Sequence, residues 1–279
     1  MKYIKLVIAI DDEYQEPFIA ELFDMGFDGF EQRDNSIIAY ITEEGLGVGD
    51  RERIEQLLAG FPGNGFIETE ELVSDKNWNE EWEQTIKAQE IGQFFVKPTW
   101  SDDPVPEGKI LLEIDPKMSF GTGYHETTRL MLNFLPSLVK KNDILIDAGT
   151  GTGILAIAAV KLGARHALAF DIDEWSIGNA RENILLNGVK SRITLRKGSA
   201  EVIQAEEKAD LLMANIQRNV ILELLPAFTE ALGEKGNLLL SGLQEDDEDV
   251  VRNKLKAHFE IISLQQENEW IAVHAKRKK

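Results

Sequence analysis

The chain has 279 residues, of which 43% are hydrophobic, enough for one large folded domain or two smaller ones. It contains no cysteine, which excludes disulfides, thiolate catalysis and cysteine-ligated zinc or iron–sulfur sites. The formal net charge of −19 disfavours nucleic-acid binding and suits a basic partner. Acidity that only maintains solubility explains this charge equally well.

Targeting and metal signals are missing from the sequence. No segment approaches the roughly 18 consecutive apolar residues of a membrane span, and the N-terminal segment becomes acidic too early for a signal peptide. We therefore expect a cytoplasmic protein that does not bind a membrane. The four histidines, at positions 125, 166, 258 and 274, lack metal-ligand spacing, so we predict no metal site.

Residues 1–74 alternate short strands and helices. Helical patterns are found in "EPFIAELFDMGF", with Phe18, Ile19, Leu22 and Phe23 expected on one face, and in "DRERIEQLLAGF", expected to be capped by Asp50 and to end near Gly60. The order βαββαβ predicts a small ferredoxin-like α+β domain. Since it contains no catalytic cluster, we expect this domain to recognise the substrate, with a scaffolding role as the alternative. Its four predicted strands are residues 3–10, 30–34, 36–42 and 66–73.

Residues 75–90 are predicted to form a helical linker, with Trp78 and Trp82 one turn apart and packed against a neighbouring domain. From residue 91 to 279, strand and helix patterns alternate in a way typical of a mostly parallel sheet covered by helices on both faces. The sequence thus predicts an α/β domain after the linker.

A glycine-rich turn lies inside "NDILIDAGTGTGILAIAAVKLGA", between a predicted strand and an apolar helix that ends at Gly163. Glycines at 149, 151 and 153 would let the backbone approach a ligand at the helix N-terminus. Ile154 stands where the dinucleotide fingerprint requires glycine, and no lysine follows as in a phosphate-binding loop. NAD is therefore disfavoured, and a tight turn without a ligand is the alternative.

Polar residues end two of the following strands. Asp171 follows "HALAF" about twenty residues after the glycines, where a carboxylate can accept both hydroxyls of a ribose, although such an Asp can also cap a helix. Glycine turn and acid together indicate an adenosine-containing ligand without a diphosphate. Asn215 ends "KADLLMAN", where its carbonyl can accept the N–H of an incoming amine. The alternative for Asn215 is a cap of the next helix.

Four segments together resemble the class I S-adenosylmethionine-dependent methyltransferases, and among them the ribosomal protein L-eleven methyltransferase family. The resemblance implies a Rossmann-like domain with a seven-stranded, mostly parallel sheet after a small N-terminal domain. It implies methyl transfer from S-adenosyl-L-methionine, which leaves S-adenosyl-L-homocysteine, to lysine side chains, the N-terminal α-amine, or both, of large-subunit ribosomal protein eleven. The segments are "DPKMSFGTGYHETT", "DAGTGTGILAIAAVKLGA", "DIDEWSIGNARENILLNGV" and "MANIQRN".

The same resemblance implies a set of cofactor contacts. Thr128 would bind the methionine carboxylate, Gly149 would admit the cofactor to the backbone, and Asp171 would bind the ribose. Asn215 would contact the cofactor and act as the catalytic residue. The loop at 115–128 would then fold over the methionine end of the cofactor. Further expected contacts are Phe120, Gly121, His125, Gly151, Ile172 and Ser199, with a core position for Phe120 and a structural role for His125 as alternatives.

Three features bear on the acceptor side. Tyr124 stands where a smaller or more polar residue is expected from the family, and "IQRN" after Asn215 also differs from other members. Trp270, in a predicted C-terminal strand pair, is expected to lie in the core, with a position facing the cofactor cleft as the alternative. No side chain is a clear general base, so we expect the amine to lose its proton to water.

Two other functions are compatible with these patterns. The chain is alternatively a methyltransferase for another protein, RNA or a small molecule, or a non-catalytic factor that holds the ribosomal protein during assembly. We expect a monomer that acts on the free ribosomal protein rather than on the ribosome and does not bind nucleic acid directly.

Overall fold

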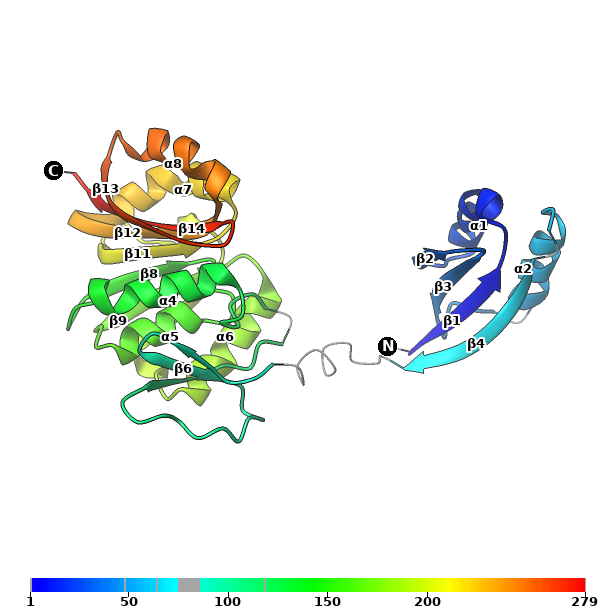
Figure 1. Cartoon of the computed structure of the whole chain (residues 1–279), viewed down its shortest axis with the longest axis horizontal. Helices are drawn as coiled ribbons and strands as arrows, with labels where there is room; N and C mark the ends of the chain where they lie inside the picture. Colours follow the sequence, from blue (N-terminus) through cyan, green and yellow to red (C-terminus); the bar gives the residue numbers. More distant parts are fainter. Residues whose placement is uncertain (1, 48, 64, 75–85, 118, 279) are drawn as a thin grey trace. The chain divides into compact units, whose positions relative to one another are not determined.

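The computed structural model describes residues 2–47, 49–63, 65–74, 86–117 and 119–278. The chain forms two compact units, Met1–Glu81 and Trp82–Lys279, with separate sheets (Figure 1). Their hydrophobic cores are separate as well.

The N-terminal unit has the predicted order βαββαβ. Its four strands form an antiparallel sheet in the order β2-β3-β1-β4, the arrangement of a ferredoxin-like sandwich. Side chains of both helices and of alternate strand positions, among them Leu6, Phe18, Leu22 and Ile54, form its core. The elements are β1 (Lys2–Ala9), α1 (Asp12–Asp24), β2 (Gly29–Arg33), β3 (Ser36–Thr42), α2 (Asp50–Ala59) and β4 (Phe66–Ser74).

Two details of these helices differ from the prediction. Phe23 is 66% exposed, because it lies about 140° around the helix from Phe18, whereas Leu22 lies only about 40° from it. The N-cap of α2 is Gly49, in the left-handed region with φ 102°, and Asp50 is the first helical residue. The carboxylate of Asp50 accepts the backbone N–H of Gly47 at 2.7 Å.

The predicted linker lies outside the described residues as far as position 85, and Trp78 and Trp82 lie there too. Residues 86–88 have no regular secondary structure, and Gln89–Ile91 form strand β5, so the predicted helix does not cover 86–90. The chain turns at Gly92, with φ 53°, and β5 pairs antiparallel with β6 (Phe94–Lys97). A parallel partner, β7 (Ile110–Glu113), completes a small sheet that the sequence did not predict.

The main sheet confirms the predicted Rossmann-like fold. Its strand order is β10-β9-β8-β11-β12-β14-β13, parallel except for β14, which runs antiparallel to both of its neighbours. The strands are β8 (Ile144–Ala148), β9 (His166–Asp171), β10 (Ile193–Lys197), β11 (Ala209–Asn215), β12 (Leu232–Gln244), β13 (Phe259–Glu267) and β14 (Trp270–Arg277).

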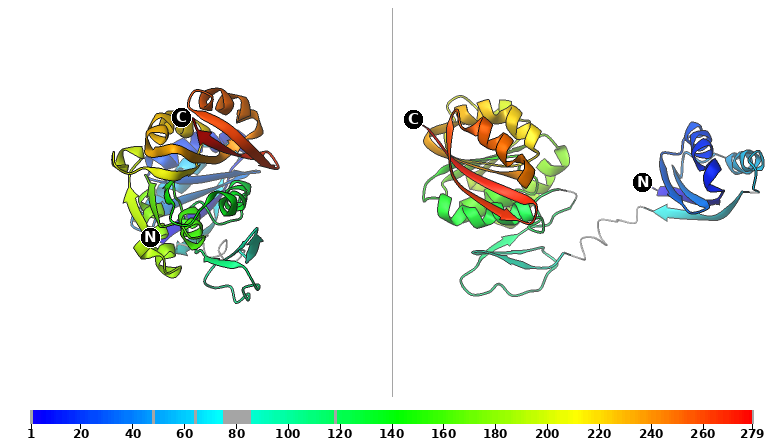
Figure 2. Two further views of the ribbon diagram at one scale, coloured as in Figure 1. Left: turned by 90° about the vertical axis from the view of Figure 1, so that its left-hand side faces the viewer. Right: turned by 45° about the horizontal axis from the view of Figure 1, so that its top comes forward.

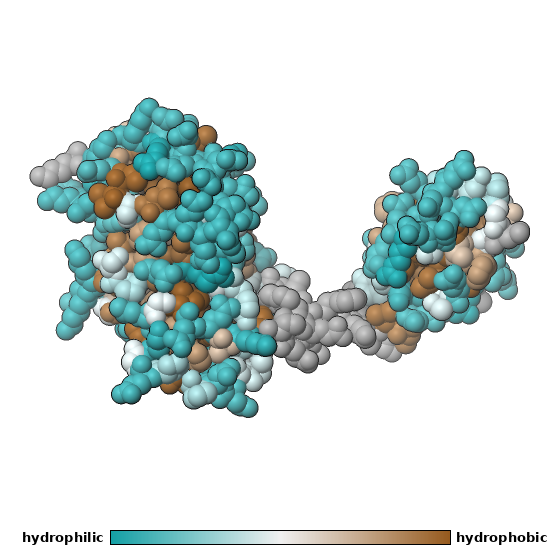
Figure 3. All heavy atoms as spheres, viewed as in Figure 1, coloured by the Kyte–Doolittle hydropathy of each residue, from teal (hydrophilic) through white to brown (hydrophobic). Residues whose placement is uncertain are grey.

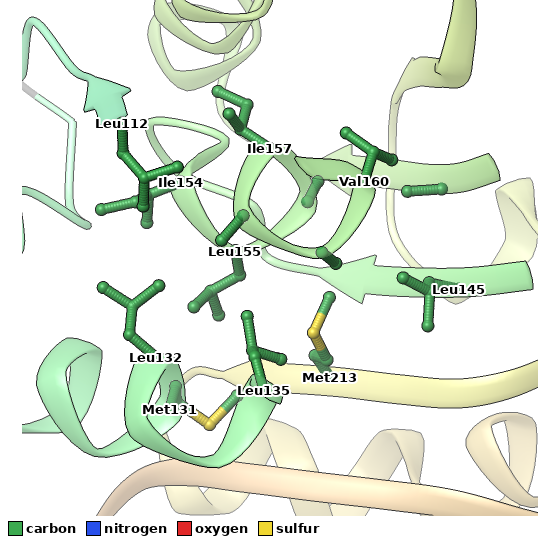
Figure 4. Close-up of a cluster of buried hydrophobic side chains, with 14 of the residues drawn as sticks. Leu112, Met131, Leu132, Leu135, Leu145, Ile154, Leu155, Ile157, Val160 and Met213 are labelled. Atoms are coloured by element: carbon green, nitrogen blue, oxygen red, sulfur yellow. The ribbon is translucent and has the colours of Figure 1, made fainter. Parts of the chain in front are cut away.

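Helices cover both faces of this sheet (Figure 2). Side chains of α4, α5 and α6 pack on one face against Leu145 and Met213, as the close-up of α4 and α5 shows (Figure 4). Side chains of α7 and α8 pack on the other face against the alternate positions Ile146 and Leu212. The helices are α4 (Glu126–Leu138), α5 (Ile154–Lys161), α6 (Glu174–Leu186), α7 (Arg218–Ala231) and α8 (Glu248–Leu255).

The surface shown in Figure 3 is mainly hydrophilic on both units, with separate smaller hydrophobic areas. Among the described residues, no helix combines the length and apolar character that a membrane crossing requires. In the same part of the chain, no group of three or more His, Asp or Glu side chains is arranged to hold a metal ion.

Candidate active site

A cavity of about 580 Å³ lies where strands β8, β9 and β11 end, at the carboxyl edge of the main sheet. This is the edge at which open α/β sheets bind ligands. Eight of the ten predicted contact residues line it: Phe120, His125, Gly149, Gly151, Asp171, Ile172, Ser199 and Asn215.

Glycines allow three backbone segments to meet at the turn after β8. Gly151 has φ 54°, and a Cβ atom there would lie 2.2 Å from the carbonyl oxygen of Phe120. At Gly149, with φ 70°, a Cβ would lie 2.3 Å from Cγ2 of Ile216. Any larger residue would force these segments apart, so the turn requires glycine for contact as well as for conformation.

Asp171 ends β9 with its carboxylate held in a fixed orientation. The backbone N–H of Gly151 donates to Oδ2 at 2.9 Å, and that of Asp173 donates to Oδ1 at 3.0 Å. Each oxygen keeps further acceptor capacity. The two hydroxyls of a ribose are suitable donors for this carboxylate.

A second carboxylate, Asp147, lies beneath the glycine turn and was not predicted as a functional residue. It is fully buried, and its Oδ2 accepts the Thr150 hydroxyl at 2.6 Å and the Ala156 N–H at 3.2 Å. Its Oδ1 has no partner among the described residues. Burial raises the pKa of Asp147 to about 6, and the charge of Asp171 acts in the same direction.

Three rings form an aromatic wall: Phe120, His125 and Trp270. The His125 ring lies 5.1 Å from that of Phe120 and 4.8 Å, edge-on, from that of Trp270, measured between centroids. His125 also caps α4, because its Nδ1 accepts the backbone N–H of Thr127. The partly buried Trp270 side chain packs against the hydrophobic core, as expected, and it also lines the cavity, because β14 begins beside it.

The other two predicted contact residues, Thr128 and Gly121, do not line the cavity. Thr127 lines it instead, because consecutive helical residues point about 100° apart. Thr128 is fully buried, and its hydroxyl has no partner among the described residues. The carbonyl of Gly121 accepts the hydroxyl of Thr152 at 2.6 Å, which ties the loop to the glycine turn.

Asn215 is the last residue of β11, and its Oδ1 is buried without a hydrogen-bond partner among the described residues. The N-cap of α7 is Gln217, so the alternative role of Asn215 as that cap is wrong. The chain beyond Asn215 contributes further lining residues that were not predicted, namely Ile216, Gln217, Val220, Leu224 and Gly242. The sequence signal for Gly242 is weak: it is a lone glycine in a strand, where its φ is 78°.

Three asparagines of α6 and its C-cap hold the start of the 115–125 loop. Asn183 accepts the Asp115 N–H at 3.0 Å and donates to the Asp115 carbonyl at 3.2 Å. Asn187 makes the equivalent pair with the backbone of Glu113, at 3.1 and 2.7 Å. Asn179 donates to Asp115 at 2.8 Å. The four-residue spacing of these asparagines places them on one face of the helix, but it does not identify their partners.

The chain is similar to proteins of one family along nearly its whole length. The family model described as "Ribosomal protein L11 methyltransferase (PrmA)" matches residues 7–278. A ribosomal protein L11 methyltransferase of Chlorobaculum tepidum is 36% identical over 275 residues, 97% of this chain and 95% of that protein. One of Caldanaerobacter subterraneus subsp. tengcongensis is 37% identical over 223 residues, 77% of this chain and 69% of that protein.

A solved structure agrees with these matches. The crystal structure of a ribosomal protein L11 methylase from Lactobacillus delbrueckii subsp. bulgaricus superimposes with a TM-score of 0.65, over 70% of this chain and 100% of that one, at 33% identity. Residues 7–278, which the family model matches, include parts of both units and the whole cavity wall described above. The chain therefore belongs to the ribosomal protein L11 methyltransferase family.

Proposed function

We propose that this protein transfers methyl groups from S-adenosylmethionine to amino groups of ribosomal protein L11, on lysine side chains, the N-terminal α-amine, or both. Membership of the family supports the reaction and the substrate. The single observation that carries the amine acceptor is Asn215 itself, which lines the cavity while its buried Oδ1 has no hydrogen-bond partner among the described residues.

The residues present fit S-adenosylmethionine, which supplies an electrophilic methyl carbon when bound. The glycine turn admits a ligand to the backbone, and the Asp171 carboxylate can receive the ribose hydroxyls. Ile172 and Ser199 line the same part of the cavity and suit an adenine. The aromatic wall and Thr127 would then contact the methionine end of S-adenosylmethionine.

Asn215 would position the acceptor amine. A buried carbonyl without a partner costs roughly 1–3 kcal/mol, and an amine N–H donated to Oδ1 would remove that cost. The same bond would direct the nitrogen lone pair toward the methyl carbon. Positioning of this kind is worth on the order of 7–11 kcal/mol of a reaction barrier, so it can supply most of the catalysis.

The acceptor amine must be neutral before it can react. Asp171 is the one carboxylate among the described residues of the cavity wall, and the N–H groups of Gly151 and Asp173 already bind it. We infer that the amine loses its proton to water. At about pH 7.5 this costs about 4 kcal/mol for a lysine and less than about 1 kcal/mol for an α-amine.

The N-terminal unit would recognise the basic substrate. Residues 1–74 contain 17 Asp and Glu but only 5 Lys and Arg, a formal net charge of −12 out of −19 for the whole chain. Such a charge density attracts a basic protein and repels RNA. Deletion of residues 1–74 should therefore abolish methylation of the protein substrate while S-adenosylhomocysteine still binds.

The deciding experiment follows a labelled methyl group from S-adenosylmethionine to free ribosomal protein L11, with total RNA and assembled ribosomes as parallel acceptors. Label is expected in the free protein, on its amines. Label only in RNA, or none despite tight cofactor binding, would contradict the proposal.

A variant isolates the role of Asn215. Asn215→Ala should keep its affinity for S-adenosylhomocysteine and lose about 100-fold in turnover, because the amine is no longer positioned. Asn253→Ala, on the exposed side of α8, removes an asparagine away from the cavity and should retain full activity. Equal activity of Asn215→Ala and the control would exclude the proposed role.

A further inference from the structure

Tyr124 connects the cavity wall to the segment that follows residues 75–85. Its hydroxyl donates to the carbonyl oxygen of Lys87 at 2.8 Å and also accepts the backbone N–H of Lys87. One phenol thus satisfies both backbone polar groups of a residue that lies outside any regular element. Tyr124 is a residue that differs from the family expectation in the sequence. This pair of hydrogen bonds indicates a structural role for its hydroxyl.

The neighbours of Tyr124 fix its backbone on both sides. Gly123 packs against β5 and β6 so closely that a Cβ would lie 3.3 Å from Ile91 Cδ1 and 3.4 Å from Val96 Cγ1. On the other side, His125 is part of the aromatic wall and caps α4. The loop therefore has little freedom to move at Tyr124 without moving His125.

Arg129 extends the connection to the β13–β14 hairpin. Its guanidinium donates to the carbonyl oxygen of Tyr124 and, through Nε and Nη2, to Glu267 Oε1 at 2.8 and 2.5 Å. Glu267 pairs with Trp270 across the β13–β14 hairpin. A continuous series of contacts thus runs from Lys87 through Tyr124 and Arg129 to the strand that bears Trp270.

We propose that Tyr124 is a positioning residue that couples residues 86–88 energetically to the cavity. Ligand binding against the aromatic wall favours the loop position in which the Tyr124 hydroxyl binds Lys87. By reciprocity, any event that holds residues 86–88 in place strengthens ligand binding. The nature of the ligand rests on the proposed function.

Tyr124→Phe in the full-length protein tests this coupling, because it keeps the ring and removes only the hydroxyl. The measurement is amide hydrogen exchange at residues 86–88, with and without S-adenosylhomocysteine. In the wild-type protein, saturating ligand should slow exchange of the Lys87 amide by about 5-fold, the value of one to two hydrogen bonds. In Tyr124→Phe, S-adenosylhomocysteine should no longer slow the exchange of the Lys87 amide.

The kinetics of the variant should separate positioning from chemistry. The affinity for S-adenosylhomocysteine should fall, and the KM for S-adenosylmethionine should rise, each by about 5-fold, with little change in kcat. Thr229→Val is the matched control, because Thr229 donates its hydroxyl to the Leu225 carbonyl at 2.7 Å on α7, outside the cavity wall. It should behave as wild type in both measurements.

Two results would overturn the coupling. One is an unchanged Lys87 exchange rate when ligand saturates the wild-type protein, and the other is equal protection in Tyr124→Phe. Failure of the wild-type protein to bind S-adenosylhomocysteine would overturn the proposed function and this proposal together. That failure would be recognised separately, in the binding measurement.

Discussion

The two sides of the cavity are built in different ways. The side proposed to bind the methyl donor, called the donor side, presents backbone groups and one oriented carboxylate. It consists of Gly149, Gly151, Asp171, Ile172 and Ser199. The side proposed to hold the amine, called the acceptor side, presents mainly apolar side chains and one amide oxygen that has no partner among the described residues. It consists of Asn215, Val220, Leu224, Gly242 and Trp270.

This difference suggests how each side responds to change. On the donor side the backbone is in close contact with its neighbours, so an added atom should disturb ligand binding severely. On the acceptor side, side chains set the position and the environment of the amine, so their removal should alter turnover more than cofactor affinity. Four predictions test the distinction.

The largest effect is expected from Gly151→Ala. Its Cβ would overlap the Phe120 carbonyl at 2.2 Å in a backbone conformation with φ 54° that disfavours alanine. We expect the binding free energy of S-adenosylhomocysteine to weaken by more than about 3 kcal/mol, which is over 100-fold in affinity. Titration calorimetry measures this change. Gly178→Ala, in α6 with open space around its Cβ, should bind normally and stabilise the fold slightly. Near-normal binding by Gly151→Ala would show that the turn adapts.

The acceptor side is expected to make the reaction rate depend on pH. Between pH 7 and 9 the transfer step should accelerate about 100-fold for a lysine and about 8-fold for an α-amine, because the neutral fraction of each amine rises accordingly. Single-turnover measurements with lysine and α-amine peptides would record this. A flat profile would indicate a general base in the site.

Asp147 gives the donor side a pH dependence of its own, in stability. The folded pKa of about 6 exceeds the ordinary value of 3.8, so the folded state holds a proton that the unfolded state has released. The free energy of unfolding should therefore fall by about 2 kcal/mol between pH 4.5 and 7.5 from this group alone.

The variant Asp147→Asn, which has no proton to lose, should not show this part of the pH dependence. Urea unfolding of both proteins at several pH values measures the difference. Parallel pH profiles for the two proteins would mean that the carboxylate is ionised at little cost.

The smallest effect is expected from Trp270→Ala. It removes one ring of the aromatic wall, so turnover with the protein substrate should fall about 10-fold, while S-adenosylhomocysteine affinity should change less than about 2-fold. Ile172→Ala, on the donor side and 72% exposed, should weaken that affinity about 3-fold without a loss of kcat. If both variants changed the same parameter, the division into two sides would be wrong.

Prediction from the sequence succeeded where the information is local. The βαββαβ order follows from hydrophobic periodicity, and the glycine turn and Asp171 follow from residues that are close in the chain. Prediction from the sequence was incomplete where segments that are distant in the chain meet in the structure. The role of Trp270 depends on β14 starting beside the cavity, and the separation of Thr127 from Thr128 depends on the rotation of α4.

The sequence by itself thus determined the two fold classes and the family, and it predicted the residues of the proposed donor side, because backbone conformation and helix or strand periodicity are set within a few residues. Only the tertiary structure decided which rings form the aromatic wall, how the three asparagines hold the loop, and that Tyr124 binds Lys87. These contacts join residues from different elements. Their partners follow from packing of the elements and carry no local signature in the sequence.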